Sequence, residues 1–595
     1  MPEYLSPGVY VEEFDSGAVP MQGVSTSTAG FIGMAERGKV SGEPTLVTNF
    51  SEFLRTFGGY LSENEYGNYR YLAYAVEHFF VNGGSRCFVM RVAPEDAKCA
   101  ESVKNAEIVK FTAKNPGLWG NKIRVNIYPA SKAKTQIFDI TGEKSYLVKS
   151  NAGFNPGDIV VFNDGKSKTV NKVLTSQDNI IEFEKPFDGN VVDKNLLPKK
   201  VIESCELTIE VKFEDVKETY EKVSFNVNAA NFIEKKMEKS ELVSVEYIGS
   251  KAAQPAKSNG PKDKEGAPKA AQSGGLQTPF EMFADAGVEC VTISLENGSN
   301  GSVSKVTAAD FIGSDFGPGK RTGLQAFVDN DEVSIMAIPG ITDPNVQLSL
   351  VAHCENLGSR FAILDIPRES KKIPDVIAHR DMFDTQFAAM YHPWLQVFDP
   401  LDKRNINIPP SGSIAGIFSR TDIERGVHKA PANEVVRACV GLDCQYSTGE
   451  QDILNPRGVN LIRSFTGRGI RVWGARTCSS NGQWKYVNVR RLFIYLEESI
   501  KRNTNWVVFE PNDEVLWARV RRTIELFLST VWRTGALAGT TAEEAFFVDI
   551  GRTTMTQDDI DNGRLICVIG AAPVKPAEFV IFRITQKTAE ASEEV

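Results

Sequence analysis

Residues 69–92, YRYLAYAVEHFFVNGGSRCFVMRV, place a helix directly before a strand. Apolar side chains recur at helical spacing through residues 69–81: Leu72, Val76, Phe79 and Phe80. Asn82-Gly83-Gly84 then supplies the C-terminal stop, and residues 86–92 have the apolar composition of a buried strand. A helix followed at once by a buried strand is typical of α/β alternation.

The same alternation resumes after residue 330. Residues 332–338 predict a strand, Asp343-Pro344 opens a helix as N-cap and first-turn proline, and Gly358 closes it. Residues 360–366 predict the next strand. We therefore expect an α/β core domain made of residues 21–105 plus 311–460.

The region between these two parts has a different character. Most runs between residues 107 and 250 alternate with period two and are separated by turn dipeptides. We expect residues 107–310 to form one or two inserted β-rich outer domains, with 157–190 as a small closed β insert. Residues 250–279 contain no aromatic side chain, so this stretch is expected to be a disordered surface loop.

Residues 461–570 predict a separate C-terminal α+β domain. Strands are expected at 470–475, 484–489 and 506–509, and helices at 489–502 and 513–533. The second helix has an apolar face at helical spacing: Leu516, Val520, Ile524 and Phe527. The predicted fold class is thus a multidomain α/β (α+β) protein.

Both ends of the chain carry short β-prone runs. Residues 6–14 read SPGVYVEEF, and residues 576–584 read PAEFVIFRI. A terminal strand needs a sheet edge, because its backbone N–H and C=O groups require partners. Two apolar terminal strands therefore predict docking on a sheet, either within their own chain or on another copy of it.

Composition narrows the class of protein. The chain has 595 residues, enough for roughly three to five domains. A formal net charge of −9 argues against direct nucleic-acid binding. The nine cysteines form no CxxC pair, as is typical of a reducing compartment. With no signal-like N-terminus and no apolar run of about 20 residues, we expect cytoplasmic synthesis and no membrane insertion.

No catalytic or metal-binding constellation emerges from the sequence. Residues 313–321, GSDFGPGKR, fail the P-loop pattern, because Lys320 precedes Arg321 rather than Ser or Thr. His353-Cys354 suggests a buried thiol and a surface histidine more than a nucleophile and its base. The five histidines lack metal-ligand spacing. We predict no catalytic residue, no cofactor and no metal, and hence a structural protein rather than an enzyme.

Eight segments, in order, resemble the contractile tail sheath family, which includes phage tail sheaths and phage-tail-like injection systems. They are SPGVYVEE (6–13), NPGLWGN (115–121), PSGSIAGI (410–417), LNPRG (454–458), GRGIRVWGAR (467–476), WKYVNVRRLFIYLE (484–497), WVVFEPND (506–513) and GAAPVKPAEFVIFRI (570–584). The resemblance is strongest over residues 1–127 and 320–595, and it is absent in 250–279.

The resemblance implies a function and partners. Sheath subunits of this family polymerise as stacked hexameric rings around an inner tube, and contraction drives that tube through a target envelope. The implied partners are further copies of the chain, the inner tube protein, and baseplate and tail-terminator or cap proteins. The subunit would be made and assembled in the cytoplasm and become part of a phage virion tail or an injection-system particle, released or envelope-anchored.

The resemblance also assigns roles to the ends. Residues 1–20 and 571–595 would be linking arms that complete a sheet in the C-terminal domains of neighbouring subunits. The N-terminal strand would comprise Val9, Tyr10, Val11, Glu12, Glu13 and Phe14. The C-terminal strand would comprise Phe579, Val580, Ile581, Phe582, Arg583 and Ile584. The expected hinges beside these strands are Gly17, Gly23, Gly570 and Pro573.

A basic helix is the expected contact with the inner tube. The helix at 513–533 carries four arginines on an otherwise acidic chain: Arg519, Arg521, Arg522 and Arg533. In the family a helix of the C-terminal domain contacts the tube partly through charge. The alternative is a solvated basic face or ion pairs within the chain.

Two other readings stay open. An α/β hydrolase-like enzyme with β-rich accessory domains predicts a polar pocket and a small oligomer. The other alternative is a static structural polymer, such as a sheath-like tube that never contracts. The two alternatives and the contractile sheath differ in assembly, which the sequence does not display.

Overall fold

The chain divides into two units in the computed structural model. The model describes residues 21–103, 108–163, 168–186, 201–248, 289–581 and 583. The first unit combines residues 1–35, 40–92 and 307–595, and the second combines 36–39 and 93–306. The expected outer loop at 250–279 lies outside the described residues.

The first unit is built on a mixed sheet of eight strands. In spatial order these are β2 (Thr45–Val47), β3 (Cys87–Val92), β1 (Ala29–Met34), β17 (Ile335–Ala337), β18 (Phe361–Asp365), β19 (Ala388–His392), β23 (Val459–Phe465) and β24 (Gly469–Val472). The pairs from β3 to β23 are parallel, and both outermost pairs are antiparallel. Because β23 and β24 join this sheet, the core extends past the boundary expected at residue 460.

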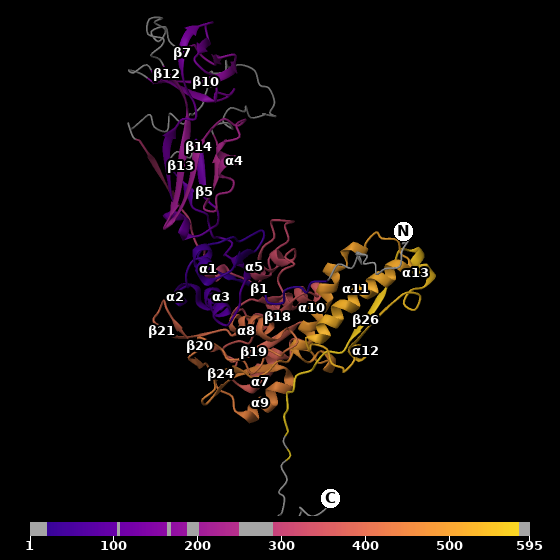
Figure 1. Ribbon diagram of the computed structural model, residues 1–595. Helices are drawn as coiled ribbons and strands as arrows, with labels where there is room; N and C mark the ends of the chain where they lie inside the picture. Colours follow the sequence, from indigo (N-terminus) through magenta and orange to yellow (C-terminus); the bar gives the residue numbers. More distant parts are fainter. Residues whose placement is uncertain are drawn as a thin grey trace, which may run out of the picture. The chain divides into compact units, whose positions relative to one another are not determined.

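Helices cover both faces of the sheet (Figure 1). Ile335, Ala337, Phe361 and Ile363 face a cluster that includes side chains of α3 (Leu72–Val81) and α8 (Ser411–Arg425). Met336 and Leu364 alternate with them and are also buried, as expected of a parallel sheet buried on both sides. The other helices of this part are α1 (Phe50–Phe57), α2 (Glu63–Tyr66), α5 (Ala308–Ile312), α6 (Pro344–Leu357), α7 (Ile373–Arg380) and α9 (Thr448–Leu454).

The expected α/β alternation is present in the elements on which it was based. The quoted stretch forms α3 and then β3, and α6 begins after its N-cap Asp343 and ends at Gly358 in the left-handed conformation. A small sheet of β21 (Arg404–Ile408), β20 (Leu395–Asp399) and β22 (Gly441–Leu442) lies between β19 and β23 in sequence.

Two glycines of α8 let it lie directly against α3. A Cβ built on Gly416 would lie 2.4 Å from the Phe79 carbonyl oxygen, and one on Gly412 would lie 2.5 Å from the Ala75 Cα. Neither neighbour is the flexible end of a side chain, so α3 itself would have to move. The motif at residues 410–417 therefore encodes a close helix–helix contact.

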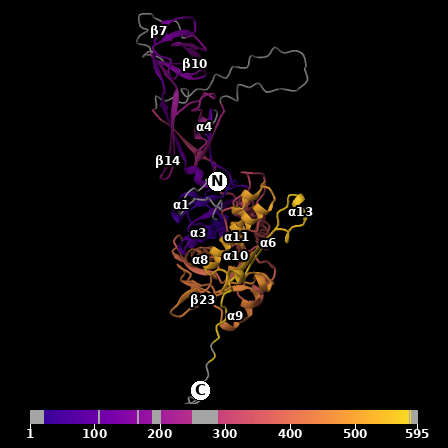
Figure 2. The same ribbon diagram turned by 45° about the vertical axis from the view of Figure 1, so that its right-hand side comes forward.

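The C-terminal part of this unit contains two long helices, α10 and α11, both labelled in Figure 2, and a two-stranded sheet. Its elements are α10 (Val487–Asn503), α11 (Glu514–Arg533), α12 (Ala542–Ala545), β25 (Phe546–Ile550), α13 (Gln557–Asp561) and β26 (Cys567–Ala571). Leu516, Val520, Ile524 and Phe527 are buried in one cluster with Leu492 and Leu496 of α10, which confirms the predicted core face of α11.

Two expected strands of this part are absent. Gly482–Trp484 and Asn505–Val507 are 3₁₀ turns, and α10 already begins at Val487. The apolar residues at 484–489 pack as the first turn of a helix rather than pairing with a strand. Short apolar runs fit a buried helix end as well as a strand, and periodicity does not separate the two.

The second unit is rich in strands. A seven-stranded sheet has the order β14 (Val216–Val223), β13 (Glu206–Phe213), β6 (Arg124–Ala130), β16 (Val291–Glu296), β4 (Glu101–Ser102), β5 (Val109–Ala113) and β15 (Val243–Tyr247), with α4 (Ile233–Met237) beside β15. A second sheet closes on itself in the order β10 (Lys168–Gln177), β11 (Ile180–Phe183), β8 (Ser145–Val148), β7 (Lys134–Ile140), β12 (Val201–Ser204) and β9 (Ile159–Asn163). The closed sheet is wider than the 157–190 insert expected from sequence.

The α3–α8 contact yields a stability test. Gly416→Ala should lower the free energy of unfolding of the first unit by about 1–3 kcal/mol, because the added methyl overpacks the contact with Phe79. Urea denaturation followed by circular dichroism measures the change.

A matched control is Gly449→Ala in α9, where a Cβ would meet nothing within 4 Å. This substitution should be neutral or should stabilise by about 0.4–1 kcal/mol, because alanine restricts the unfolded chain. Equal losses from both substitutions would contradict the proposed role of Gly416.

Candidate functional site: the roots of the two terminal arms

We call residues 22–26 and 570–578, where the terminal arms join the subunit, the roots of the arms. The structure describes these roots more fully than the arms themselves. The N-terminal strand residues Val9 to Phe14 and the expected hinge Gly17 lie outside the described residues, as do Phe582 and Ile584. Phe579, Val580 and Ile581 are 73%, 69% and 79% exposed. No strand is assigned to described residues 572–581, so three consecutive large apolar side chains stand in solvent.

The N-terminal root runs along α10. The Asn503 side chain donates to the Gln22 carbonyl at 2.9 Å, and the Val24 amide donates to the Ser499 hydroxyl at 3.1 Å. Between these contacts Gly23 lies under Tyr495, where a Cβ would be 2.1 Å from the tyrosine oxygen. Gly23, the expected hinge, is thus packed against the end of the Tyr495 side chain.

A buried ion pair holds the next residue of this root. Arg491 of α10 donates two hydrogen bonds to Asp422 of α8, at 2.9 and 2.6 Å, and their side chains are 4% and 3% exposed. The Thr26 hydroxyl donates to Asp422 at 2.6 Å, and Arg491 donates to the Thr26 carbonyl at 2.8 Å. Burial raises the pKa of the Asp422 carboxyl, and Arg491 and Thr26 oppose that rise.

The C-terminal root begins as paired backbone. Gly570 lies in β26 opposite Phe547, whose ring stands where a Cβ would be. Pro573 bridges to Leu537, and the Val574 amide donates to the Ala536 carbonyl at 3.2 Å. The expected hinges at Gly570 and Pro573 therefore lie in paired backbone. Gly570 pairs with β25, and Pro573 pairs with the turn after α11.

Beyond Val574 the root is held by one side chain, Glu578. Arg476 donates to both carboxylate oxygens, each at 2.7 Å, in the two-pronged geometry of strong arginine–carboxylate pairs. Asn455 donates at 2.8 Å, the Tyr486 hydroxyl donates at 3.0 Å, and the Lys485 ammonium lies 3.5 Å away. We call Arg476, Asn455, Tyr486, Lys485 and Glu578 the C-terminal clamp.

The clamp sets the charge state of Glu578. Burial alone would raise the pKa of this carboxyl, but the hydrogen bonds from Arg476 and Asn455 outweigh it and hold the pKa at about 2. The Arg476 side chain is only 7% exposed. Glu578 is therefore an anion throughout the physiological pH range, and it neutralises a guanidinium that would otherwise be buried without a carboxylate.

The two-stranded sheet offers unpaired edges beside these roots. Phe546, Val548 and Ile550 of β25 are buried in the cluster of α11, whereas Phe547 and Val568 on the outer face are 57% and 46% exposed. Among the described residues, β25 and β26 pair only with each other. A two-stranded sheet with open edges and an apolar outer face is suited to accept further strands.

The four arginines of α11 do not act alike. Arg521 donates to the Ile550 carbonyl at 2.8 Å and lies 3.6 Å from Asp549, so it ties the helix to β25. Arg519 lies over the Trp506 ring at 4.3 Å. Arg522 and Arg533 have exposed side chains on the solvent side of the helix. The alternative of intrachain ion pairing thus applies to Arg521.

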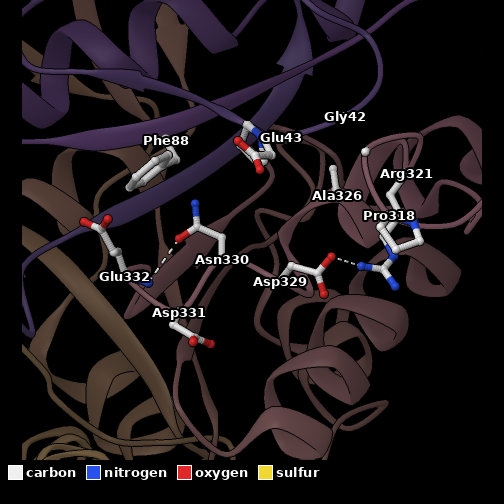
Figure 3. A pocket seen from close by; sticks show the side chains of 12 residues that line it. Gly42, Glu43, Phe88, Pro318, Arg321, Ala326, Asp329, Asn330, Asp331 and Glu332 are labelled. Atoms are coloured by element: carbon white, nitrogen blue, oxygen red, sulfur yellow. Dashed lines mark hydrogen bonds and ion pairs between the residues drawn. The ribbon is translucent and has the colours of Figure 1, made fainter. Parts of the chain in front are cut away.

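The cavity around Arg321 and the Cys354 thiol do not resemble catalytic machinery. A cavity of about 420 Å³ is lined by the acidic side chains of Glu43, Asp329, Asp331 and Glu332 together with Arg321, which pairs with Asp329 (Figure 3). Its lining contains no Ser, Cys or His. Burial raises the pKa of the Cys354 thiol to about 12, and His353 faces Arg360 instead of that thiol. These groups do not form a nucleophile–base pair.

Comparison with known proteins identifies the class. Residues 305–478 match the phage tail sheath protein central domain, and residues 479–587 match the phage tail sheath C-terminal domain. A prophage major tail sheath protein of Pseudomonas aeruginosa is 25% identical over 291 residues, covering 47% of this chain and 72% of that protein. The tail sheath protein of Escherichia phage P2 is 26% identical over 41% of this chain and 64% of its own length.

A solved sheath complex shares the fold of this chain. A sheath complex of an extracellular contractile injection system, solved in the contracted state, aligns over 99% of this chain with a TM-score of 0.50 and 21% identity. A chain of the anti-feeding prophage baseplate is 34% identical over 46% of this chain and 77% of its own length, with a TM-score of 0.40.

The chain belongs to the tail sheath protein family, whose central and C-terminal domains its residues 305–587 match. The curated relatives of this chain are tail sheath proteins by name. None of the described helices is long and apolar enough to cross a membrane.

Sequence reasoning missed the residues that hold the arms. Arg476, Tyr486 and Arg491 lie in segments already noted for their resemblance to the family, and Glu578 lies in the C-terminal one. The partners Arg476 and Glu578 are 102 positions apart. The available signal was an arginine among apolar residues in segments 467–476 and 484–497. A single sequence does not show which carboxylate binds such an arginine across that distance.

The depressed pKa of Glu578 gives a pH prediction. Its pKa falls from an ordinary value of 4.5 to about 2 in the folded chain, so the stabilisation is fully present above about pH 4.5 and is lost as the pH falls towards 2. The wild-type chain should have a higher melting temperature than Glu578→Gln at about pH 7 and should keep that advantage at about pH 5. Thermal unfolding of the soluble subunit measures both values.

Glu510→Gln, in the exposed turn before α11, serves as the control and should show no such difference. If the advantage over Glu578→Gln had already vanished at about pH 5, the carboxylate would not be held as described.

Proposed function

We propose that this subunit polymerises as stacked hexameric rings around an inner tube and that contraction of the polymer drives the tube through a target envelope. The observation that carries the proposal is the two-stranded sheet with open edges, combined with the exposed apolar side chains of Phe579, Val580 and Ile581. Partner subunits would supply the missing strands, and tail-terminator or cap proteins would close one end of the polymer.

The terminal strands supply the links in this proposal. Residues 9–14 of one arm and residues 579–584 of the other would each add a strand beside β25 or β26 of a neighbour. Strand addition gives directional hydrogen bonds, and an apolar outer face around Phe547 and Val568 would cover alternate side chains. Such links keep neighbouring subunits connected while they rotate.

Baseplate association is a further part of the proposal. One similar solved chain belongs to an anti-feeding prophage baseplate, and another belongs to a contracted sheath complex. We propose that this chain likewise forms a sheath polymer that joins a baseplate, in a phage tail or an injection-system particle. Assembly in the cytoplasm would precede release or anchoring of the particle.

Removal of the N-terminal arm tests the linking role. Deletion of residues 1–20 should leave a folded, soluble subunit, because Gln22, Val24 and Thr26 still contact α10 and α8. It should abolish tubes in negative-stain micrographs of the purified protein, because each neighbour would lack one strand. Tubes that persist at wild-type yield would refute the linking role.

The control is replacement of residues 250–279 by a short Gly-Ser linker. This change removes a similar length of chain outside both arms, and tubes should still form. A chain truncated after residue 578 makes the matching test for the C-terminal arm.

Contact with the inner tube is proposed for the exposed side of α11. Arg522 and Arg533 are better reporters than Arg521, whose reversal would also disturb β25. The double substitution Arg522→Glu and Arg533→Glu should reduce co-sedimentation of the subunit with the inner tube protein by about tenfold or more at low salt, and less at high salt. The folded state should be unchanged, since both side chains are exposed.

The matched control is Lys236→Glu and Lys239→Glu, which makes the same charge change on exposed lysines of the inserted unit. Equal loss of tube binding in both variants would point to net charge rather than to α11. Unchanged binding of the arginine variant would remove α11 from the tube interface.

A further inference from the structure

The C-terminal clamp lies directly before the apolar strand that would enter a neighbouring subunit. Glu578 is bound by Arg476, and the next three residues, Phe579, Val580 and Ile581, are exposed. The backbone pairing of β26 and its extension ends earlier, at Val574. Residues 575–577 therefore form a short span between two attachment points on the same subunit.

Four side chains from three places in the chain converge on one carboxylate. Arg476 follows β24, Asn455 begins the turn after α9, and Tyr486 and Lys485 directly precede α10. The Arg476 guanidinium also donates to the Asn455 carbonyl at 3.0 Å, and its backbone amide donates to Asn460 of β23 at 2.7 Å. Arg476 is thus held by Asn455 and by the core sheet as well as by Glu578. Forming the ion pair therefore requires little further ordering of the arginine side chain.

We propose that the C-terminal clamp sets the point at which the arm leaves its subunit, so that the link to a neighbour begins after residue 578. Glu578 acts as a positioning residue: it does not join the neighbour's sheet but fixes where the donor strand starts. This inference rests on the proposed linking role of the C-terminal arm and goes beyond it by assigning the length of the link.

The consequence is that no unattached residue separates the subunit from the donor strand. If the arm were free from Val574 onward, four further residues would separate the subunit from the donor strand, and each residue of extended chain spans about 3.3 Å. With Glu578 bound, movement of the subunit passes through Arg476 directly to the strand. The unattached span is then too short to accommodate a displacement between subunits. A displacement of one subunit must therefore rotate its neighbour.

Two insertions of the same sequence test the clamp. Gly-Ser-Gly placed between Lys575 and Pro576 lengthens the chain before the clamp, and the same tripeptide placed between Glu578 and Phe579 lengthens it after the clamp. The first should give tubes at wild-type yield, because Glu578 still reaches Arg476 and the added residues bulge out. The second should lower the yield of pelleted tubes at least fivefold or give tubes that no longer shorten on triggering.

The Glu578→Gln substitution completes the design. Combined with the first insertion, this substitution should lower the yield of tubes, because the neutral amide cannot replace the two-pronged charge pair with Arg476. Circular dichroism and size-exclusion chromatography of each soluble subunit verify that the chain is folded before assembly is scored.

Each result decides the matter. Equal behaviour of the two insertions, or a defect only in the first, would overturn the clamp. If the chain truncated after residue 578 still formed normal tubes, the linking role itself would fail, which is a different outcome from failure of the clamp alone.

Discussion

The roots of both arms depend on charged and polar groups presented by α10 and the residues just before it. Arg491 binds Asp422 and Thr26 with both ionic partners almost fully buried. Tyr486, at the N-cap of α10, binds Glu578 together with Arg476. A buried charge is costly unless it is paired and hydrogen-bonded, so Arg491 requires Asp422 and Arg476 requires Glu578. Asp422 also binds Thr26 of the N-terminal root, and Glu578 is itself part of the C-terminal root.

This arrangement suits a subunit that must move as a body. The helix that holds the arms is also packed into the C-terminal cluster through Leu492 and Leu496, and that cluster includes α11 and β25. The arm roots, the open sheet and the basic helix are therefore parts of one packed structure. In the proposed sheath, a rotation of the subunit would reach the neighbours and the tube through the same helix.

Strong sequence signals produced accurate predictions where the determining contacts are local. The helix α6 has Asp343 and Pro344 at its start and Gly358 at its end. These signals act within a few residues. The expected strand at 506–509 failed because an apolar run of four residues has no local feature that distinguishes a strand from a turn against α11.

The sequence by itself determined the class of fold, the split core, the apolar face of α11 and the family, because these depend on periodicity, local caps and segments read in order. Only the tertiary structure decided that Gly570 and Pro573 are held rather than free, that Arg521 serves β25 while Arg522 and Arg533 face solvent, and that Glu578 meets Arg476. The physical reason is sequence distance. Burial and pairing bring together side chains about a hundred positions apart, and no local pattern records which partner a buried charge will find.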